Sequence, residues 1–522
     1  MRVFVAFWML ALTACPGVDS DPELDASSLD AGGTTDASAD AGSADAPLAD
    51  LTSSDTSSAV DATATDLGGL TVLGLRVEPA SLRLAPGMSH PLRVLGQASG
   101  SQEFDVTDRV SWSVLPSTVA SVASGEVLAL AAGQAELVAS LDGVDSPPCA
   151  LDVLPPESFE ARGVWVTRWN YSTQAHVQQI VAQLAAAGVN QMYFQVRGAA
   201  DAYYASTLEP WADRLSGTLG QDPGWDPLRT AISEAHAVGI EVHAWINTFP
   251  AWSCGVALPS SSGVPHILET HPEWVVVDSS GTSMLGNCTS GYVTLSPGIP
   301  EVRAHLAAVA EEILTQYDVD GLHLDYIRYP GRQFSHDAVS EALFAEAQAL
   351  DSTLTWDDWQ RRQVNATVRD IFEVLLGVRP SATLSAAVWG IYRNIWGWSS
   401  VSQGVVDYYQ DSRAWTAGRY IDAIVPMIYW PLTDPLGQRL DFATLIADHV
   451  DNNPGRQVLA GIEANYTSFD EITNQVEATR AAGAPGTVLF AYTYLQDRSY
   501  WDELEAGPFA GEAWAPLRPW RW

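Results

Sequence analysis

Acidic side chains at the ends of two apolar runs are the residues of this sequence best suited to chemistry. Asp325 ends the run DGLHLD, where alternation places it on the same face as His323, and Glu463 ends the run VLAGIE. Hydrolysis of a glycosidic bond usually needs two carboxyl groups, one as proton donor and one as nucleophile or base. Asp325 is our first candidate, and Glu463 is the better-placed second. Asp411 is an alternative second carboxyl, although it could equally cap a following helix.

These carboxyl groups also have structural alternatives. Asp325 could pair with Arg328, and Glu463 could be an exposed glutamate that pairs with an arginine of a loop. Asp320 begins the DGLHLD run, at the opposite end from Asp325, so we expect it to serve stability rather than substrate binding. If the substrate carries a 2-acetamido group, Asp325 could instead orient that group as an internal nucleophile.

Polar and aromatic side chains crowd the ends of the neighbouring apolar runs. They could bind sugar hydroxyl groups or stack on the apolar faces of sugar rings, and several could equally belong to a core. The candidates for substrate contact are Arg197, His243, Trp245, Asn247, His323, Arg328, Trp389, Tyr429 and Tyr492.

The composition excludes several other chemistries. All 26 basic residues are arginine, so no lysine can form a Schiff base or hold a nucleotide phosphate. A formal charge of -37 opposes binding to a phosphate backbone, and we expect no nucleic-acid partner. His243, His266, His271 and His323 lack the spacing of known zinc motifs, so we expect neither a metal nor a cofactor.

The elements that must position the candidates alternate between strand-like and helix-like runs. Eight such pairs follow residue 157, and the helical runs carry apolar residues at three-and-four spacing. The strand-like runs lie near 163–168, 191–197, 241–247, 321–327, 383–389, 423–430, 458–463 and 487–492. Eight alternating repeats predict a (β/α)8 TIM barrel over residues 157–522, in which functional residues gather at the carboxyl ends of the strands.

The start of the chain has the pattern of an export signal. Residues 1–15 combine a basic residue, an apolar stretch and small residues before Cys15, and the segment LTAC resembles the lipobox of bacterial lipoproteins. This predicts cleavage before Cys15 and lipid attachment to its sulfur; an ordinary signal peptide is the alternative. Pro16 follows, which favours delivery to the outer membrane, at its periplasmic face or the cell surface. Residues 16–68, rich in Asp, Ala and Ser, are predicted to form a disordered acidic linker.

Residues 69–155 show short alternating runs broken by Gly and Pro, which predict a small all-β sandwich. The order resembles bacterial Ig-like group 2 domains, with Trp112 in a V-x-W-like strand, a turn over 122–127, and Gly133 in an A-G-x-A turn. We expect this unit to act in spacing or adhesion.

The barrel runs themselves carry a family resemblance. ARGVWVT, YFQVR, HAWIN, VDGLHLDYIRYP, YQDSRAW and IDAIVPMIYW occur in an order that resembles the glycosyl-hydrolase-like family 10 over about residues 157–500. The resemblance implies cleavage of peptidoglycan glycan strands, particularly strands stripped of their stem peptides. In such a substrate Arg197 could meet the lactyl carboxylate of a muramic acid, or it could form a salt bridge with a nearby acid.

Further expectations concern the cysteines, the partners of the protein and the alternatives to a peptidoglycan hydrolase. Cys254 and Cys288 lie in a long stretch, 248–296, where an exported protein could form a disulfide, which leaves Cys149 unpaired. We expect a monomer that contacts polysaccharide and is held at a membrane by its lipid anchor. The alternatives are hydrolysis of another extracellular polysaccharide, such as an α-glucan or capsule, and glycan binding without catalysis.

Overall fold

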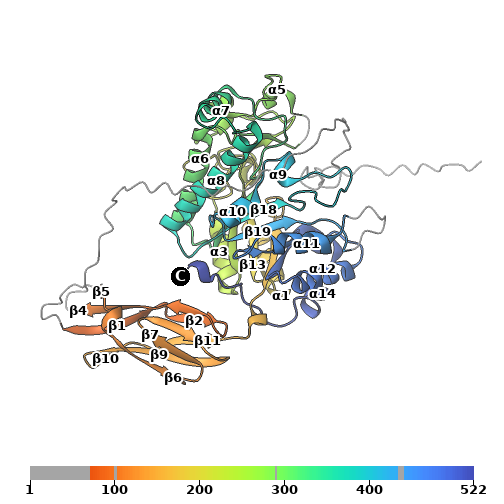
Figure 1. The fold of residues 1–522 in the computed structure, drawn as a ribbon. Helices are drawn as coiled ribbons and strands as arrows, with labels where there is room; N and C mark the ends of the chain where they lie inside the picture. The colour runs from red at the N-terminus through yellow and green to blue at the C-terminus, as the bar shows by residue number, and fades with distance from the viewer. Residues whose placement is uncertain (1–70, 99–102, 289–290, 433–439, 522) are drawn as a thin grey trace, which may run out of the picture.

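The computed structural model describes residues 71–98, 103–288, 291–432 and 440–521. The predicted signal segment, Cys15 and the linker over 16–68 therefore lie outside the described residues. Figure 1 shows a small all-β unit formed by the first described residues and a larger unit of strands and helices that follows it. Of the helices in the described ranges, none is long and apolar enough to cross a membrane.

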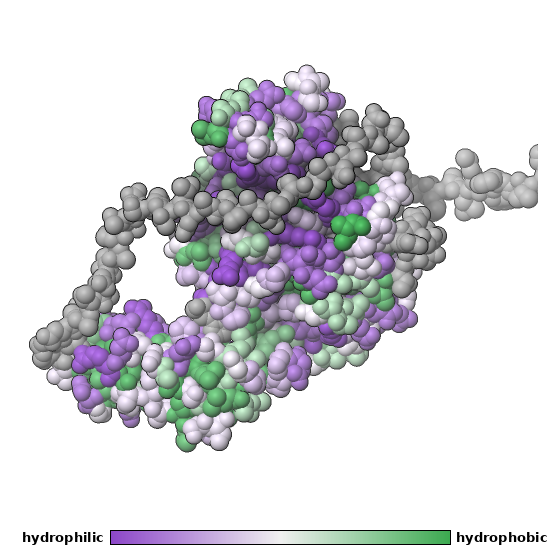
Figure 2. Space-filling view, in the orientation of Figure 1, coloured by the Kyte–Doolittle hydropathy of each residue, from purple (hydrophilic) through white to green (hydrophobic). Residues whose placement is uncertain are grey.

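The small unit consists of short, mostly antiparallel strands around its own apolar core. Strand β9 (Gly133–Leu141) illustrates the reason, because Ala135, Leu137 and Ala139 alternate with more exposed residues and face the core. The other strands are β1 (Val72–Glu78), β2 (Ser81–Leu84), β3 (Ser89–Pro91), β4 (Arg93–Ala98), β5 (Glu103–Asp105), β6 (Ser111–Leu115), β7 (Ala120–Ala123), β8 (Glu126–Ala129), β10 (Val144–Asp145) and β11 (Cys149–Val153). The Ig-like resemblance stays a prediction. Figure 2 shows hydrophobic residues in green on the viewer's face of this unit. The exposed large apolar residues of the unit include Leu115 and Leu128.

The larger unit is a closed barrel of parallel strands, as the sequence predicts. The strands are β12 (Ala161–Val166), β13 (Gln191–Arg197), β14 (Glu241–Asn247), β17 (Gly321–Asp325), β18 (Thr383–Trp389), β19 (Ala423–Met427), the pair β20 (Gln457–Val458) and β21 (Ala460–Glu463), and β22 (Gly486–Phe490). Each strand pairs in parallel with the next, β22 pairs with β12, and β20 and β21 share one position, so eight positions close the ring. The TIM-barrel prediction is confirmed.

Helices follow the strands and cover the barrel from outside (Figure 1). Helix α1 (Gln174–Ala186) shows why: Val177, Ile180, Val181 and Leu184 form one buried stripe, and the Thr173 side chain caps its first turn. The corresponding helices after the later strands are α3 (Pro227–Ala237), α6 (Pro300–Gln316), α8 (Trp356–Val378), α10 (Ser412–Ala417), α11 (Phe442–Asp451), α12 (Phe469–Ala481), α13 (Tyr492–Arg498) and α14 (Trp501–Ala506).

The barrel interior is filled by large side chains rather than left as a channel. Trp165, Tyr193 and Trp245 pack with smaller apolar residues of the other strands in one cluster, and all three are almost completely buried. At the amino-terminal end of β19, Asp422 is fully buried in a salt bridge with Arg521 of the last described residues. The filled interior directs any functional site to the carboxyl ends of the strands, where Asp325 and Glu463 are the last residues of β17 and β21.

Candidate active site

Asp325 lies at the mouth of the barrel in an environment that suits a charged carboxylate. It is 7% exposed and pairs in register with Asn247 of the adjacent strand. Its Oδ1 accepts a hydrogen bond from the backbone N–H of Tyr326 at 2.6 Å and lies 3.6 Å from Nη1 of Arg328. Tyr326 adopts a left-handed φ of 47°, which is uncommon for a tyrosine and occurs directly beside the candidate catalytic group.

Glu463 lies in an environment that disfavours a charged carboxylate. Its side chain is half-buried at the end of β21, and burial raises the pKa of its carboxyl group. Within the described ranges, no hydrogen bond or ion pair joins the Glu463 carboxyl to another side chain. The raised pKa and the missing cation favour the protonated form, which is the form a proton donor needs.

Tyr429 shows that these two carboxyl groups share one site. It follows β19, which pairs with β21 on one side and with β18, the neighbour of β17, on the other. Burial raises the pKa of the Tyr429 hydroxyl well above its usual range, and the charges of Asp325 and Glu463 raise it further. The Tyr429 ring stacks on Phe490 with ring centroids 5.5 Å apart. A neutral hydroxyl group is therefore held near both acids.

Arg328 and Trp389 form one wall of the mouth. The guanidinium carbon of Arg328 lies 4.5 Å from the ring centre of Tyr326 and 5.4 Å from that of Trp389. Trp389 is held in turn by its Nε1, which donates to the Ser402 carbonyl at 2.8 Å. These two predicted contact residues therefore meet beside Asp325, where an aromatic face and a cation are both available to a ligand.

Three other predicted contact residues lie lower, in the barrel interior, and a fourth is buried at the level of Asp325. His323 is fully buried; its Nε2 accepts from Trp165 Nε1 at 3.0 Å and its Nδ1 lies 2.9 Å from Ser385 Oγ. Burial lowers the pKa of His323 well below its usual range, with a smaller contribution from His243, so the ring stays neutral. The lower residues are His243, Trp245 and His323, whereas Asn247 is in register with Asp325; each of the four is at most 2% exposed. We assign them to the floor of the site rather than to its open surface.

Three other candidates, Asp411, Tyr492 and, as described below, Arg197, lie away from the mouth. Asp411 is the N-cap of α10, where its Oδ1 accepts from the Ala414 N–H at 3.2 Å and from Tyr392 Oη at 2.8 Å. Tyr492 begins α13, and its hydroxyl donates to Gln183 of the outer helix α1. Neither arrangement points to catalysis or to a sugar in the mouth.

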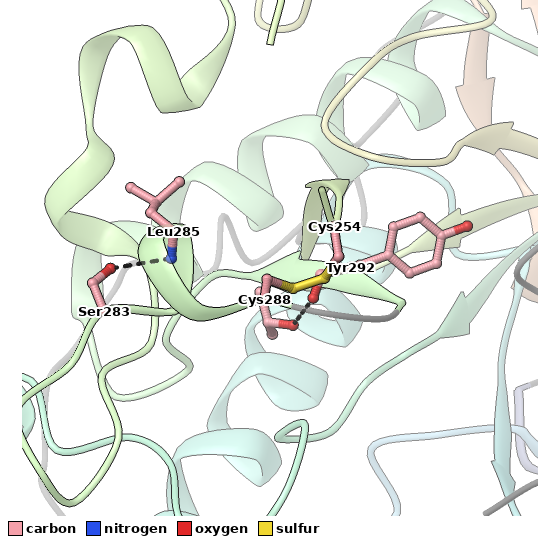
Figure 3. The surroundings of a disulfide bond; sticks show 6 residues. Cys254, Ser283, Leu285, Cys288 and Tyr292 are labelled. Carbon is pink, nitrogen blue, oxygen red and sulfur yellow. Dashed lines mark hydrogen bonds between the residues drawn. A yellow bond between two sulfur atoms is a disulfide. The ribbon is translucent and has the colours of Figure 1, made fainter. Parts of the chain in front are cut away.

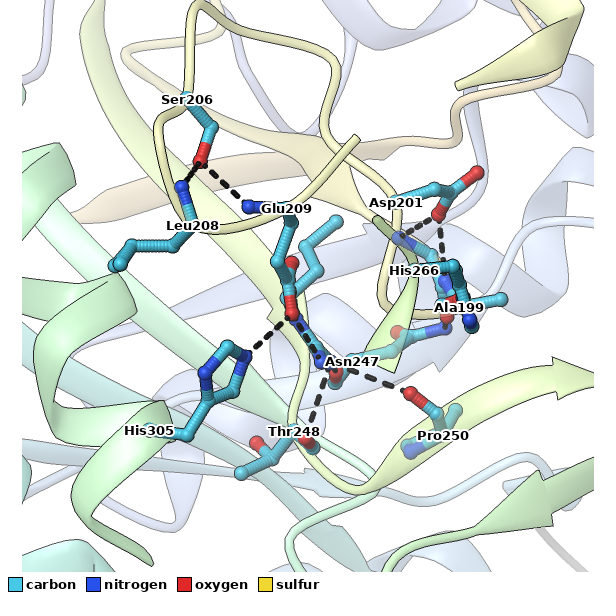
Figure 4. Close-up of polar contacts among 12 residues, drawn as sticks. Ala199, Asp201, Ser206, Leu208, Glu209, Asn247, Thr248, Pro250, His266 and His305 are labelled. Atoms are coloured by element: carbon cyan, nitrogen blue, oxygen red, sulfur yellow. Dashed lines mark hydrogen bonds and ion pairs between the residues drawn. The ribbon is translucent and has the colours of Figure 1, made fainter. Parts of the chain in front are cut away.

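Arg197 is the third, and it is fully buried with every donor engaged. Its Nη2 donates to Glu209 Oε1 at 2.7 Å and its Nε donates to Glu209 Oε2 at 2.8 Å. Its Nη1 donates to the carbonyls of Asn247, Thr248 and Pro250. Figure 4 shows these groups, together with His305, which also contacts Glu209. Of the two alternatives for Arg197, the structure has the salt bridge.

The long loop after β14 reaches the site through a disulfide-linked hairpin. Cys254 and Cys288 are joined, with Cα atoms 5.1 Å apart, beside the hairpin of β15 (Pro250–Ser253) and β16 (Tyr292–Thr294) (Figure 3). Tyr292 meets Tyr326 edge-on at 5.5 Å and accepts a hydrogen bond from Arg168 Nη2 at 2.7 Å. Cys149 is unpaired and buried in the small unit.

Arg168 and Tyr326 are site residues that the sequence reasoning missed. Arg168 lies just after β12, and the absence of a side chain at Gly198 makes room for it, since a Cβ there would lie 2.5 Å from Arg168 Nε. The position of both residues next to a strand end was visible in the sequence. In the part of the chain that the structure describes, no cluster of three or more His, Cys, Asp or Glu side chains could hold a metal ion.

A parallel barrel with carboxyl groups at the ends of two strands is an architecture found in glycoside hydrolases, among other enzymes. The family described as glycosyl hydrolase-like 10 matches residues 160–475, and the chain belongs to this family.

Two curated relatives and one solved structure illustrate the similarity. Glycosyl hydrolase YngK of Bacillus subtilis (strain 168) is 31% identical over 277 residues, which are 51% of this chain and 52% of the relative. Glycosyl hydrolase DigH of Escherichia coli (strain K12) is 28% identical over 284 residues, 51% of this chain and 61% of the relative. The chain thus spans between half and two thirds of these relatives. The glycoside hydrolase domain of PgaB from Bordetella bronchiseptica aligns with 66% of this chain and 98% of its own at 13% identity and a TM-score of 0.49.

Proposed function

We propose that this protein hydrolyses O-glycosidic bonds of bacterial cell-wall glycan, with Asp325 and Glu463 as its catalytic carboxyl pair. The observation that carries the proposal is the contrast between the two acids around Tyr429. Asp325 contacts an N–H group and a guanidinium, whereas burial raises the pKa of Glu463, which forms no ion pair with any of the described residues. When the environments of two carboxyl groups favour opposite protonation states in this way, one group serves as the anion and the other as the acid.

The proposed reaction follows from this division. Glu463 gives its proton to the oxygen of the leaving sugar as the bond from that oxygen to the anomeric carbon breaks. Asp325 supplies negative charge on the side where positive charge develops at the anomeric carbon, either by attacking that carbon or by orienting a 2-acetamido group that does so. Water completes hydrolysis, its hydroxyl ending on the anomeric carbon and its proton returning to the carboxyl that acted as acid.

Tyr429 and the neutral floor support this chemistry. Because burial raises its pKa and the charges of both acids raise it further, the Tyr429 hydroxyl stays protonated and can donate a hydrogen bond to a sugar held between them. The rings of Trp389 and Phe490, at the carboxyl ends of β18 and β22, offer apolar faces for sugar rings. The buried, neutral His323 below them adds no competing proton donor at working pH.

We further propose that the glycan is peptidoglycan, acted on in strands that have lost their stem peptides, and that the enzyme reaches it from an outer-membrane lipid anchor at Cys15. Membership of the glycosyl hydrolase-like 10 family and the lipobox-like segment LTAC support this assignment. The acidic linker over 16–68 would hold the barrel away from the membrane, because like charges keep such a segment extended.

The test compares substrates and variants. The mature chain is incubated with intact peptidoglycan, peptide-free strands, an α-glucan and a capsular polysaccharide, and released fragments are followed by mass spectrometry. We expect cleavage of peptide-free strands and a loss of about 100-fold or more in rate for Asp325→Asn and for Glu463→Gln. Asp411→Asn should keep most of the activity, because asparagine caps a helix as well as aspartate does. Cleavage of the α-glucan instead would replace the substrate assignment, and full activity of Asp325→Asn would refute the mechanism.

A further inference from the structure

Arg328 is held rigidly at the mouth while part of its hydrogen-bonding capacity is unused. Its side chain is 12% exposed, and its guanidinium lies against the rings of Tyr326 and Trp389. Nη1 is buried and has no hydrogen-bond partner among the described residues. Its acidic neighbour Asp325 is 3.6 Å away, which is beyond the length of a good hydrogen bond. A buried cationic donor without a partner is costly, so a bound group that accepts from it would gain stability.

Two other arginines at or just after strand ends, Arg197 and Arg168, are engaged within the protein. All donors of Arg197 that the structure describes go to Glu209 and to three backbone carbonyls. Arg168 is 3% exposed and donates to Tyr292. Arg328 differs from these two arginines in having a buried donor without a hydrogen-bond partner among the described residues.

A carboxylate is the group that fits this donor best. The planar guanidinium can give two parallel hydrogen bonds to a carboxylate, and such charge-assisted bonds are about twice as strong as neutral ones. The chain's formal charge of -37 repels an acidic polymer at long range. Recognition of an acidic sugar must then come from a local, partly buried cation, where solvent ions screen the attraction least.

We propose that Arg328 binds a carboxylate group of the sugar held between Asp325 and Glu463, and that this contact makes the enzyme selective for an acidic glycan. This inference rests on the proposed function and specifies its substrate. In peptidoglycan the lactyl carboxylate is free only where the stem peptide is absent, since the peptide is joined to it as an amide. Arg328 would then be the residue that distinguishes stripped strands from peptide-bearing ones. A uronic acid would offer the same chemistry from another source.

The experiment uses the mature chain and matched glycans. Peptide-free strands are compared with the same strands after their carboxyl groups have been reduced to alcohols, and with a polyuronate as the alternative source. We expect kcat/KM to fall about tenfold or more when the carboxyl groups are reduced, the size typical of one lost charged hydrogen bond. Arg328→Gln should act on both kinds of strand at the same low rate, and Arg328→Lys should keep part of the preference.

Arg229 provides a matched control. It also lies three residues after an aspartate, 3.8 Å from Asp226, and over a tyrosine ring, but it is on the outer helix α3. Arg229→Gln should leave the preference for carboxylated strands unchanged. Circular dichroism and thermal unfolding of each variant establish that the barrel is folded before rates are compared.

Binding separates this inference from the proposed function. In a Glu463→Gln background, Kd is measured for intact and carboxyl-reduced strands with Arg328 present or replaced by glutamine. A tenfold preference that disappears with Arg328 supports the inference even if the native enzyme cleaves neither strand, in which case the proposed function alone fails. Equal Kd values for the two strands, or a preference that survives Arg328→Gln, overturn the inference. Preference for the polyuronate alone would support Arg328 as the carboxylate contact and identify a uronic acid as its source.

Discussion

Replacing Glu209 by glutamine tests whether the buried ion pair behind the mouth holds the site together. Glu209 accepts from Arg197 Nε and Nη2 and from His305 Nε2, the last at 3.1 Å. The same guanidinium binds the carbonyl of Asn247, whose strand position is paired with Asp325. A neutral glutamine would leave the Arg197 charge buried without its counter-ion.

The magnitude follows from the protonation of Glu209. Burial alone would raise its pKa, but the charges of Arg197 and His305 outweigh this effect and lower the pKa from 4.5 to about 2. At about 1.4 kcal/mol per pH unit, the charged form is stabilised by about 3 kcal/mol in the folded protein. Removing one partner of a buried pair costs about 3–5 kcal/mol, so the two arguments agree. Because the folded pKa is the lower one, this stability is complete above pH 4.5 and is lost as the pH falls toward 2.

The assay is urea unfolding of the barrel, followed by the fluorescence of the chain's 20 tryptophans. Glu209→Gln should be about 3 kcal/mol less stable than the native protein at pH 7, and this difference should shrink by about 2 kcal/mol at pH 3. Asp318→Asn is the control, because its ion pair with Arg379 is exposed and solvent screens it. Equal stability of Glu209→Gln and native protein at pH 7, or a difference that is the same at pH 3, would refute the reasoning.

Three further predictions concern the site and its loop. As a proton donor with a raised pKa, Glu463 should make kcat fall as the pH rises through that pKa. Glu463→Gln should be at least as stable as the native protein at pH 8, because glutamine buries no charge. A less stable variant would contradict the argument that burial raises the pKa. The double replacement Cys254→Ser with Cys288→Ser removes a disulfide that links residues 34 positions apart. Calorimetry should show a loss of up to about 4 kcal/mol in the free energy of unfolding, and proteolysis should cut that loop earlier. Unchanged proteolysis would argue against a role of the disulfide in holding the loop. His323→Leu leaves Trp165 Nε1 without its acceptor and should lower the free energy of unfolding by about 1–3 kcal/mol. The pH profile of kcat should keep its shape, because His323 stays neutral. A displaced profile would show that His323 titrates.

Much of the fold could be predicted from the sequence because it depends on local patterns. Alternation of strand-like and helix-like runs sets the barrel, since each run must bury its apolar side against its neighbours. The same alternation places Asp325 and Glu463 at the carboxyl ends of their strands, and the structure has them there. Boundaries were less accurate: the last predicted strand was extended to Tyr492, which instead begins helix α13.

The partners of each side chain were decided only by the tertiary structure. Arg197 looks as suitable as Arg328 for a carboxylate when only strand ends are compared, but the loop after β13 brings Glu209 back to occupy it. The proximity of Tyr429 to both acids likewise depends on the ring, which brings the carboxyl ends of β17, β19 and β21 to the same mouth. A periodic pattern determines the face and the end of an element to which a residue belongs. Which groups meet there depends on loops and ring closure, and these contacts decide which carboxyl is charged and which arginine is free to bind.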